Sequence, residues 1–327
     1  MPKVELHLHL EGAIPLNTLL QLIEKYKGKN FISYSELERK FGYTDFSHFL
    51  NIWVWKNRFI REYDDFELIA EQVALDLAKQ NIRYAEISFS PTDFRRSNLI
   101  PQQIAISIRK GMNKHIDKIE INLIADLVRD ELDKMEQFNQ ILEVRNHGII
   151  GIGLGGKEKE FPPNLFKNVF TEAKKQGLKT TCHAGEAAGA DYIWQAINNL
   201  EVDRIGHGTT AMNDPNLVDY LIEHQIPVEM NPISNVRTNV VNNLSEHPIY
   251  DFYRNGMLVS VSTDDPKMFN TSLENEFTEL IKTFDLTLDD VIALARNAIN
   301  SAWCEDSYKT RLNTELTSYA DGHLNSL

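Results

Sequence analysis

Cysteine is scarce in this chain of 327 residues, which contains only Cys182 and Cys304. Two cysteines exclude the framework of several disulfides that stabilises small secreted domains, and their scarcity suits a reducing cytoplasm. We also expect no signal peptide, because the first predicted strand begins almost at Met1, without a basic start or an apolar core. We therefore expect a cytoplasmic protein.

Long apolar runs and positive charge are also in short supply. No stretch approaches the ~20 apolar residues that cross a bilayer, and 34 basic against 47 acidic side chains give a net charge of −13. Such a charge repels phosphate backbones and anionic membranes, so we expect neither nucleic acid nor a membrane as a partner. Flexible linkers, low-complexity segments and internal repeats are absent too, which predicts one domain over residues 1–327.

Short β-rich segments alternate with longer helical ones along the whole chain. The first predicted strand lies within Val4–Gly12, and seven more follow at Ile82–Phe89, Ile121–Leu127, Ile149–Leu154, Leu178–His183, Arg204–His207, Pro227–Asn231 and Leu258–Thr263. Eight strands separated by helices are typical of parallel β–α units. We therefore predict an α/β fold of the TIM (β/α)8 barrel class, with additional helices in the last sixty or so residues.

A segment before the second strand, at about Thr44–Arg61, is rich in aromatic residues such as Phe49, Trp53 and Phe59. Aromatic residues at helical spacing usually pack into the core. The alternative is that part of this segment covers a ligand pocket, and the sequence alone leaves both interpretations open.

The first strand carries the pair His7 and His9, whose side chains must share one face because strand side chains repeat with period two. Two imidazoles can bind one metal ion, but a zinc-type site needs three or four protein ligands. The alternative is a pair of surface histidines on an edge strand. What decides between them is whether further ligands lie at the ends of the other strands.

Further metal-ligating side chains do fall at predicted strand ends, namely His183, His207, Asp264 and Asp265. In a parallel barrel these ends meet on one face, where catalytic groups collect. Three histidines and a carboxylate suit a divalent ion, with zinc as the first candidate and iron, manganese or cobalt as others. The pattern therefore favours one metal site over scattered structural histidines.

Glu186 follows His183 by three residues and is expected just beyond the end of the strand. A carboxylate that is shielded from water beside a metal can have a pKa suited to proton transfer. The alternative is a glutamate at the start of a helix, stabilised by the helix dipole. Cys182 should face the opposite side of the strand and be a packed thiol rather than a nucleophile.

Four motifs together resemble the adenosine deaminase family of metal-dependent amidohydrolase barrels. They are VELHLHLEG, HAGE, RIGHG and STDDP, in this order, and the resemblance runs from Val4 to about Leu273. One departure lies in the segment GLGGKE, where this chain has Gly153 and many members carry an acidic residue. Four motifs in register are far more specific than any single one.

This resemblance implies a set of roles for the residues of the motifs. One Zn²⁺ per chain would be held by His7, His9, His183 and Asp264. The catalytic groups around its bound water would be Glu186, His207 and Asp265. Contacts to the substrate would come from His9, Glu11, Gly156 and Asp265.

The implied reaction is the hydrolytic deamination of a 6-aminopurine nucleoside, with adenosine as the first candidate. A divalent ion lowers the pKa of its water to about 7, and a protonated Glu186 can donate to N1 of the purine, so that the 6-oxopurine forms and ammonia leaves. Alternatives are adenine, a modified nucleoside such as 6-aminodeoxyfutalosine, or, more remotely, another amidohydrolase reaction. The oligomeric state stays open.

Two expectations concern the choice of substrate. Glu11 stands where adenosine deaminases often carry an aspartate that resembles an acceptor for the ribose 5′-hydroxyl, and its longer side chain would change that contact. Phosphate is disfavoured by the negative charge, so we expect AMP to be a poor substrate. The segment Asn231–Thr238 is expected at the mouth of the site, where Ser234 and Asn235 would contact the substrate or only fix the loop.

Overall fold

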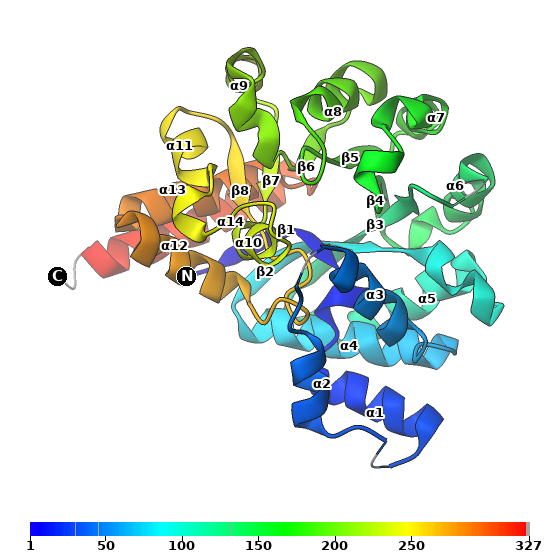
Figure 1. Ribbon diagram of the computed structural model, residues 1–327. Helices are drawn as coiled ribbons and strands as arrows, with labels where there is room; N and C mark the ends of the chain where they lie inside the picture. Colours follow the sequence, from blue (N-terminus) through cyan, green and yellow to red (C-terminus); the bar gives the residue numbers. More distant parts are fainter. Residues whose placement is uncertain (30, 45, 132, 325–327) are drawn as a thin grey trace.

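Eight parallel strands, in the order of the chain, form the centre of the molecule, as the computed structural model shows for residues 1–29, 31–44, 46–131 and 133–324 (Figure 1). Hydrogen bonds from His9 N to Asp264 O and from Asp264 N to His7 O join the last strand to the first and close the barrel. The predicted fold class is thereby confirmed. The strands are β1 Lys3–His9, β2 Ile82–Phe89, β3 Glu120–Val128, β4 Ile149–Gly155, β5 Lys179–Ala184, β6 Arg204–His207, β7 Val228–Met230 and β8 Val259–Val261.

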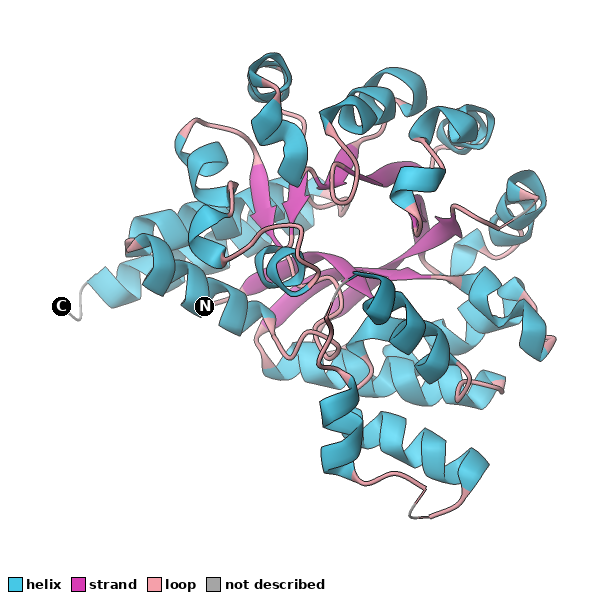
Figure 2. Cartoon of the chain, in the orientation of Figure 1, coloured by secondary structure: helices cyan, strands magenta, loops and turns pink. Residues whose placement is uncertain are grey.

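Helices surround the strands on the outside, as Figure 2 shows. Within the described residues they are α1 Leu16–Lys27, α2 Tyr34–Lys40, α3 Phe46–Asn57, α4 Tyr63–Lys79, α5 Pro101–Met112, α6 Lys134–Leu142, α7 Lys167–Lys175, α8 Ala190–Gln195, α9 Pro215–Glu223, α10 Pro232–Arg237, α11 Ile249–Arg254, α12 Leu273–Phe284, α13 Leu288–Ser301 and α14 Asp306–Leu324. The last three are the additional helices that the sequence predicts. No helix of the described part is long and apolar enough to cross a membrane.

Strand β1 shows how the sequence builds both surfaces of the barrel wall. All seven of its residues are buried, because helices cover the outside and side chains fill the inside. The apolar residues Val4, Leu6 and Leu8 join the hydrophobic core, so the alternate positions, His7 and His9 among them, face the interior of the barrel. The period-two pattern of the sequence therefore places both imidazoles inside.

Two short helices, α2 and α10, were not predicted. Helix α2 begins with a capping box in which Ser33 and Glu36 exchange side-chain and backbone hydrogen bonds, a spacing that is visible in the sequence. Helix α10 lies within the segment that the sequence assigns to a loop at the mouth of the site, and its Pro232 occupies the first turn. Both helices lie between predicted elements, so the order of the strands is unaffected.

Candidate active site

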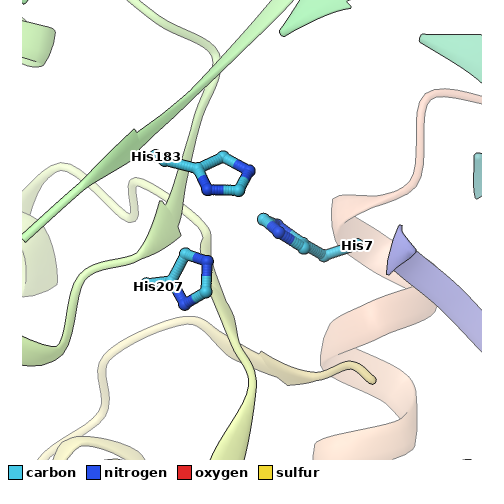
Figure 3. Close-up of side chains that lie close together, drawn as sticks. All are labelled: His7, His183 and His207. Atoms are coloured by element: carbon cyan, nitrogen blue, oxygen red, sulfur yellow. The ribbon is translucent and has the colours of Figure 1, made fainter. Parts of the chain in front are cut away.

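The four histidines expected at the strand ends lie together at one end of the barrel. The ring centroid of His7 is 5.3 Å from that of His9, 4.6 Å from that of His183 and 4.9 Å from that of His207. Figure 3 shows the rings of His7, His183 and His207 grouped around one point. Four residues from three strands that are distant in sequence therefore share one buried cluster.

The donor atoms of this cluster fit a metal ion. Nitrogen and oxygen atoms lie within 4.8 Å of one another in three groups: His7, His183 and His207; His7, His9 and Asp264; and Glu186, His207 and Asp264. The Nε2 atoms of His7 and His207 are buried and have no hydrogen-bond partner within the described part of the chain. Buried polar atoms are normally satisfied, and neutral imidazoles with a carboxylate suit a divalent ion of the zinc type.

Backbone strain coincides with the cluster. His207 and Asp264 have φ angles of 63° and 62°, in the left-handed region that non-glycine residues seldom adopt. Each follows or ends a strand, so the unusual φ turns its side chain toward the interior instead of continuing the strand. Such strain persists only where the surrounding structure imposes it, and it is concentrated at functional sites.

Three imidazoles have their Nδ1 atom in contact with a neighbouring side chain. Nδ1 of His7 lies 2.8 Å from Oε2 of Glu229, and Nδ1 of His9 lies 3.1 Å from Oδ2 of Asp126. Nδ1 of His207 lies 3.1 Å from the amide nitrogen of Asn235. Because an amide nitrogen donates, the proton of neutral His207 is on Nε2, which faces the site. Asp126 and Glu229 were not predicted as site residues, because only the closed barrel brings them close to the histidines.

Two acidic groups of the site, Glu186 and Asp265, have raised pKa values. Burial, together with the negative charges of Asp264 and Glu158, raises the pKa of Glu186 well above its usual value. Burial and the charge of Asp264 raise the pKa of Asp265 to about 8. In contrast, burial lowers the pKa of His207 to about 3, which keeps this imidazole neutral. At neutral pH the site thus offers a protonated carboxyl group beside the neutral imidazoles of His183 and His207, whose pKa values burial lowers.

The loop that carries Glu186 is held by a buried carboxylate that the sequence reasoning also missed. Glu158 accepts hydrogen bonds from the backbone N–H groups of Gly185 and Ala187, both at 2.6 Å, and of Ala188 at 2.9 Å. Three backbone donors on one carboxylate leave the loop little freedom. Glu158 therefore fixes the position of the Glu186 side chain above the histidines.

A cavity of about 540 Å³ opens from the cluster toward α3. His9, His183, Glu186, Asp264 and Asp265 line its inner end. Phe49 and Trp53 of α3 line it further out, so this aromatic segment does cover a pocket. Gly156 also lines the cavity and has a φ of 96°, a conformation that only glycine adopts without strain.

Glu11 is placed differently from the other predicted contacts. Its side chain is buried, its Oε1 accepts a hydrogen bond of 2.9 Å from Ser90 N, and it is not among the described residues that line the cavity. Burial raises its pKa to about 7. Ser90 does line the cavity, so Glu11 reaches the pocket through the backbone of Ser90.

The segment after β7 contacts the site from behind rather than at the cavity wall. Ser234 donates a hydrogen bond of 2.6 Å to Oδ2 of Asp264, while Asn235 contacts His207. Both residues are fully buried, and neither lines the cavity within the described chain. Cys182 is buried as expected, and burial raises the pKa of its thiol to about 12, which suits packing rather than nucleophilic chemistry.

Comparison with known proteins places this geometry among purine deaminases. The family model described as adenosine deaminase matches residues 2–319. Aminodeoxyfutalosine deaminase of Streptomyces avermitilis is 32% identical over 98% of this chain and 91% of its own length. Adenine deaminase of Crocosphaera subtropica is 33% identical over 95% and 97%, and adenosine deaminase of Clostridium kluyveri is 31% identical over 97% and 94%.

Solved structures agree with the sequence relatives. Adenine deaminase from Arthrobacter aurescens superposes with a TM-score of 0.93 at 29% identity, covering 98% of this chain and 99% of that one. An amidohydrolase from Burkholderia ambifaria with bound zinc gives 0.88 at 27% identity, covering 98% and 92%. The N6-methyl-AMP deaminase of Arabidopsis thaliana gives 0.88 at 26% identity, covering 99% and 98%. The substrates in these names differ, although the fold is shared.

Proposed function

The chain belongs to the adenosine deaminase family, and we propose that it removes the 6-amino group of a purine nucleoside by zinc-dependent hydrolysis, with adenosine as the first candidate substrate. Membership makes it a hydrolase that acts on the C–N bond of a cyclic amidine. The family is metal-dependent, and the zinc-bound structure from Burkholderia ambifaria supports zinc as the ion. The ion, the roles of the residues and the substrate are parts of the proposal.

The observation that carries this proposal is the position of Glu186 between the histidines and the cavity. Its Oε2 lies 3.7 Å from Nδ1 of His183 and 3.6 Å from Nε2 of His207, and its side chain lines the cavity. The expected metal ligands are His7, His9, His183 and Asp264. An ion bound there lowers the pKa of a water molecule to about 7, which supplies the nucleophile at neutral pH.

The remaining steps belong to the side chains of this protein. Glu186, protonated because of its raised pKa, donates a proton to N1 of the purine and makes C6 electrophilic. Water then adds to C6, with Nε2–H of His207 directing its oxygen and Asp265 accepting a hydrogen bond from it. Collapse of the tetrahedral carbon breaks the C6–N6 bond; of the two protons of the added water, one leaves with the amino group as ammonia and the other restores the acid form of Glu186.

The polar residues that line the cavity favour a nucleoside over a free base. Beyond the cluster the lining continues through Ser90, Thr92 and Asn57, polar groups that suit the hydroxyl groups of a ribose. A nucleoside extended beyond its 5′ position is the second candidate. The outer cavity reaches Ser97 and Arg58, and a relative that covers nearly the whole chain is named aminodeoxyfutalosine deaminase.

The charge of the cavity disfavours a phosphate. Among the described side chains, seven carboxyl groups line it, against two basic side chains, Arg58 and Lys157; the seven are Asp93, Asp126, Asp130, Glu131, Glu186, Asp264 and Asp265. Lys157 is already paired, with its Nζ 3.0 Å from Oδ2 of Asp130. This balance of described charges opposes a dianionic group. A neighbour in the comparisons acts on a methylated AMP, so AMP belongs in the test.

The test is kcat/KM for adenosine, adenine, AMP and 5′-extended adenosines, measured side by side as ammonia release. We expect adenosine or an extended nucleoside to exceed both adenine and AMP. A preference for adenine of more than tenfold, about 1.4 kcal/mol of transition-state stabilisation, would replace the nucleoside with the free base. AMP as the best substrate would refute the charge argument, and no ammonia from any of them would refute the proposed reaction.

A further inference from the structure

Strand β4 has glycine at every second position, Gly151, Gly153 and Gly155, on the face directed into the barrel. A Cβ built at these positions would lie 3.0 Å from the Trp303 ring, 1.9 Å from Oδ1 of Asp126 and 3.8 Å from Nε2 of His183, respectively. None of the three has a φ in the left-handed region. A side chain at 151 would meet the Lys179 carbonyl oxygen at 2.7 Å as well as the Trp303 ring, and one at 153 would meet the Asp126 carboxylate, so both positions have little space beyond glycine.

The gap at Gly153 is filled by the Asp126 carboxylate from the neighbouring strand. Asp126 and Gly153 are direct partners in the parallel register of β3 and β4, so their side chains would point the same way. A Cβ at 153 would lie 1.9 Å from Oδ1 of Asp126, much closer than two non-bonded atoms can approach. In its present orientation, the Asp126 carboxylate occupies the space that a Cβ at position 153 would need.

The same carboxylate faces a proposed metal ligand. Oδ2 of Asp126 lies 3.1 Å from Nδ1 of His9, within ion-pair distance, and is a buried atom without a hydrogen-bond partner in the described residues. Nε2 of His9 lies on the other side, 3.3 Å from Oδ1 of Asp264. An imidazole that ligates a metal through one nitrogen carries its proton on the other, and a carboxylate on that proton fixes the tautomer and the orientation of the ring.

The partner histidine of the pair is arranged in the same way. Nδ1 of His7 lies 2.8 Å from Oε2 of Glu229, while its Nε2 lies 3.6 Å from Oδ1 of Asp264. Each imidazole of the His-x-His pair thus turns Nε2 toward Asp264 and Nδ1 toward a buried carboxylate. The carboxylates come from opposite sides, Glu229 from β7 and Asp126 from β3.

We propose that Asp126 is a positioning residue for His9. The absence of a side chain at Gly153 leaves the space that the Asp126 carboxylate occupies. Positions 126 on β3 and 153 on β4 together have space for one carboxylate, which can belong to a residue at either position. This inference rests on the proposed function only through the role of His9 as a metal ligand. It explains why this chain has glycine at 153, and it predicts that the pair responds to substitution as a pair.

The test is zinc affinity, measured by competition with a chromogenic chelator, for the single variants Asp126→Ala, Asp126→Asn, Asp126→Gly and Gly153→Asp and for the double variant Asp126→Gly/Gly153→Asp. Loss of a carboxylate that orients a metal-bound histidine typically weakens metal binding by about 10- to 100-fold. We expect Asp126→Ala to lie in that range, Asp126→Asn to lose less, and the double variant to recover at least about tenfold relative to Asp126→Gly. Asp219→Asn on the exposed face of α9 is the control for loss of one charge.

The unfolding temperature of each metal-free variant separates orientation from stability. Asp126→Ala should keep it, because the ion-pair contact of this buried carboxylate within the described chain is with His9, a proposed metal ligand. Gly153→Asp alone should lower it, because two side chains then compete for one space. Wild-type zinc affinity in Asp126→Ala would overturn the inference while leaving the proposed function intact. A wild-type protein without affinity for any divalent ion would overturn both.

Discussion

The interior of the barrel contains two polar layers that differ in one respect. At the floor, Arg204 is fully buried, and its guanidinium donates to Glu229, Glu86 and the Ser301 carbonyl. At the rim, the Nε2 atoms of His7 and His207 are buried without a hydrogen-bond partner in the described chain. We define the floor layer as Glu86, Arg204 and Glu229, and the rim layer as the four histidines with Glu186, Asp264 and Asp265.

The electrostatics of the two layers follow from this difference. In the floor layer, burial would raise the pKa of Glu229, but Arg204 and His7 outweigh burial and lower it to about 2. At Glu186 in the rim layer burial prevails, and the pKa of this carboxyl group is raised well above its usual value. Charges that are paired inside the protein stabilise the fold, whereas buried groups without partners are available to a ligand. Substitutions in the floor layer should therefore change stability, and substitutions in the rim layer should change activity.

The largest effect on stability is expected from Arg204→Met in the floor layer. This substitution leaves Glu86 and Glu229 buried without their cation, and breaking a buried ion pair in this way costs about 3–5 kcal/mol. The free energy of unfolding in urea, followed by circular dichroism, measures the loss. Arg254→Met is the matched control, because Arg254 pairs with Asp290 at the exposed surface. Equal urea midpoints for the wild type and Arg204→Met would mean that the floor layer does not stabilise the fold.

The matching change in the rim layer is Glu186→Gln, which should affect turnover and leave stability unchanged. An amide cannot supply the proton, and general acid groups typically contribute about 10²–10⁴-fold to the rate. Steady-state kcat should fall by that factor while zinc content and unfolding temperature persist. Because the acidic form is needed, wild-type kcat should also fall as pH rises through the raised pKa of Glu186. Near-normal kcat in Glu186→Gln would assign the proton transfer to another group.

A smaller effect is expected from His247, which supports the rim layer from behind. Its Nε2 lies 3.0 Å from Oδ1 of Asn235, and burial lowers its pKa to about 3. Below the unfolded-state pKa of about 6.5 the unfolded chain takes up a proton and the folded chain does not, so stability falls as pH falls. The loss approaches about 1.4 kcal/mol per pH unit down to the folded pKa.

The measurement for His247 is the free energy of unfolding between pH 7 and pH 5, compared with His247→Gln. Glutamine does not titrate, so the variant should be less stable at pH 7 but should lose less stability on acidification. Parallel curves for the two proteins would show that His247 is not a source of acid sensitivity.

The smallest effect is expected from Glu11→Asp. Glu11 contacts Ser90 N rather than the cavity, so a side chain shorter by one methylene should shift Ser90 and raise KM several-fold with little change in kcat. The ratio of kcat/KM for adenosine to that for adenine should change by less than tenfold, below about 1.4 kcal/mol. A larger change would mean that Glu11 itself selects for or against the ribose.

The barrel and the histidine cluster could be predicted because they depend on local pattern. Period two places His7 and His9 on one face, and the positions of His183 and Asp264 at strand ends follow from the alternation of strands and helices. Side chains at the ends of parallel strands must meet at one rim. The sequence order of the strands therefore carries enough information to gather the ligands.

The partners of these residues depend on register and could not be predicted. Asp126 reaches His9 although β2 lies between their strands, because the register of β1, β2 and β3 brings the two side chains to the same height in the barrel. Arg204 contacts Glu86 across the barrel. Glu158 holds the loop of Glu186 from 27 residues away. None of these contacts leaves a periodic signal in the sequence. Gly153, like Glu11, is visible in the sequence as a departure from the family, but the reason for Gly153 lies in the neighbouring strand.

The most direct test of the assignment of the rim layer is a zinc titration of metal-free protein. Protein treated with a chelator is mixed with increasing zinc, and ammonia release from adenosine is recorded together with the unfolding temperature. The account predicts no activity without metal, a linear rise that ends at about one zinc per chain, and a higher unfolding temperature for the zinc-bound protein. Ammonia release that survives complete removal of metal would contradict it.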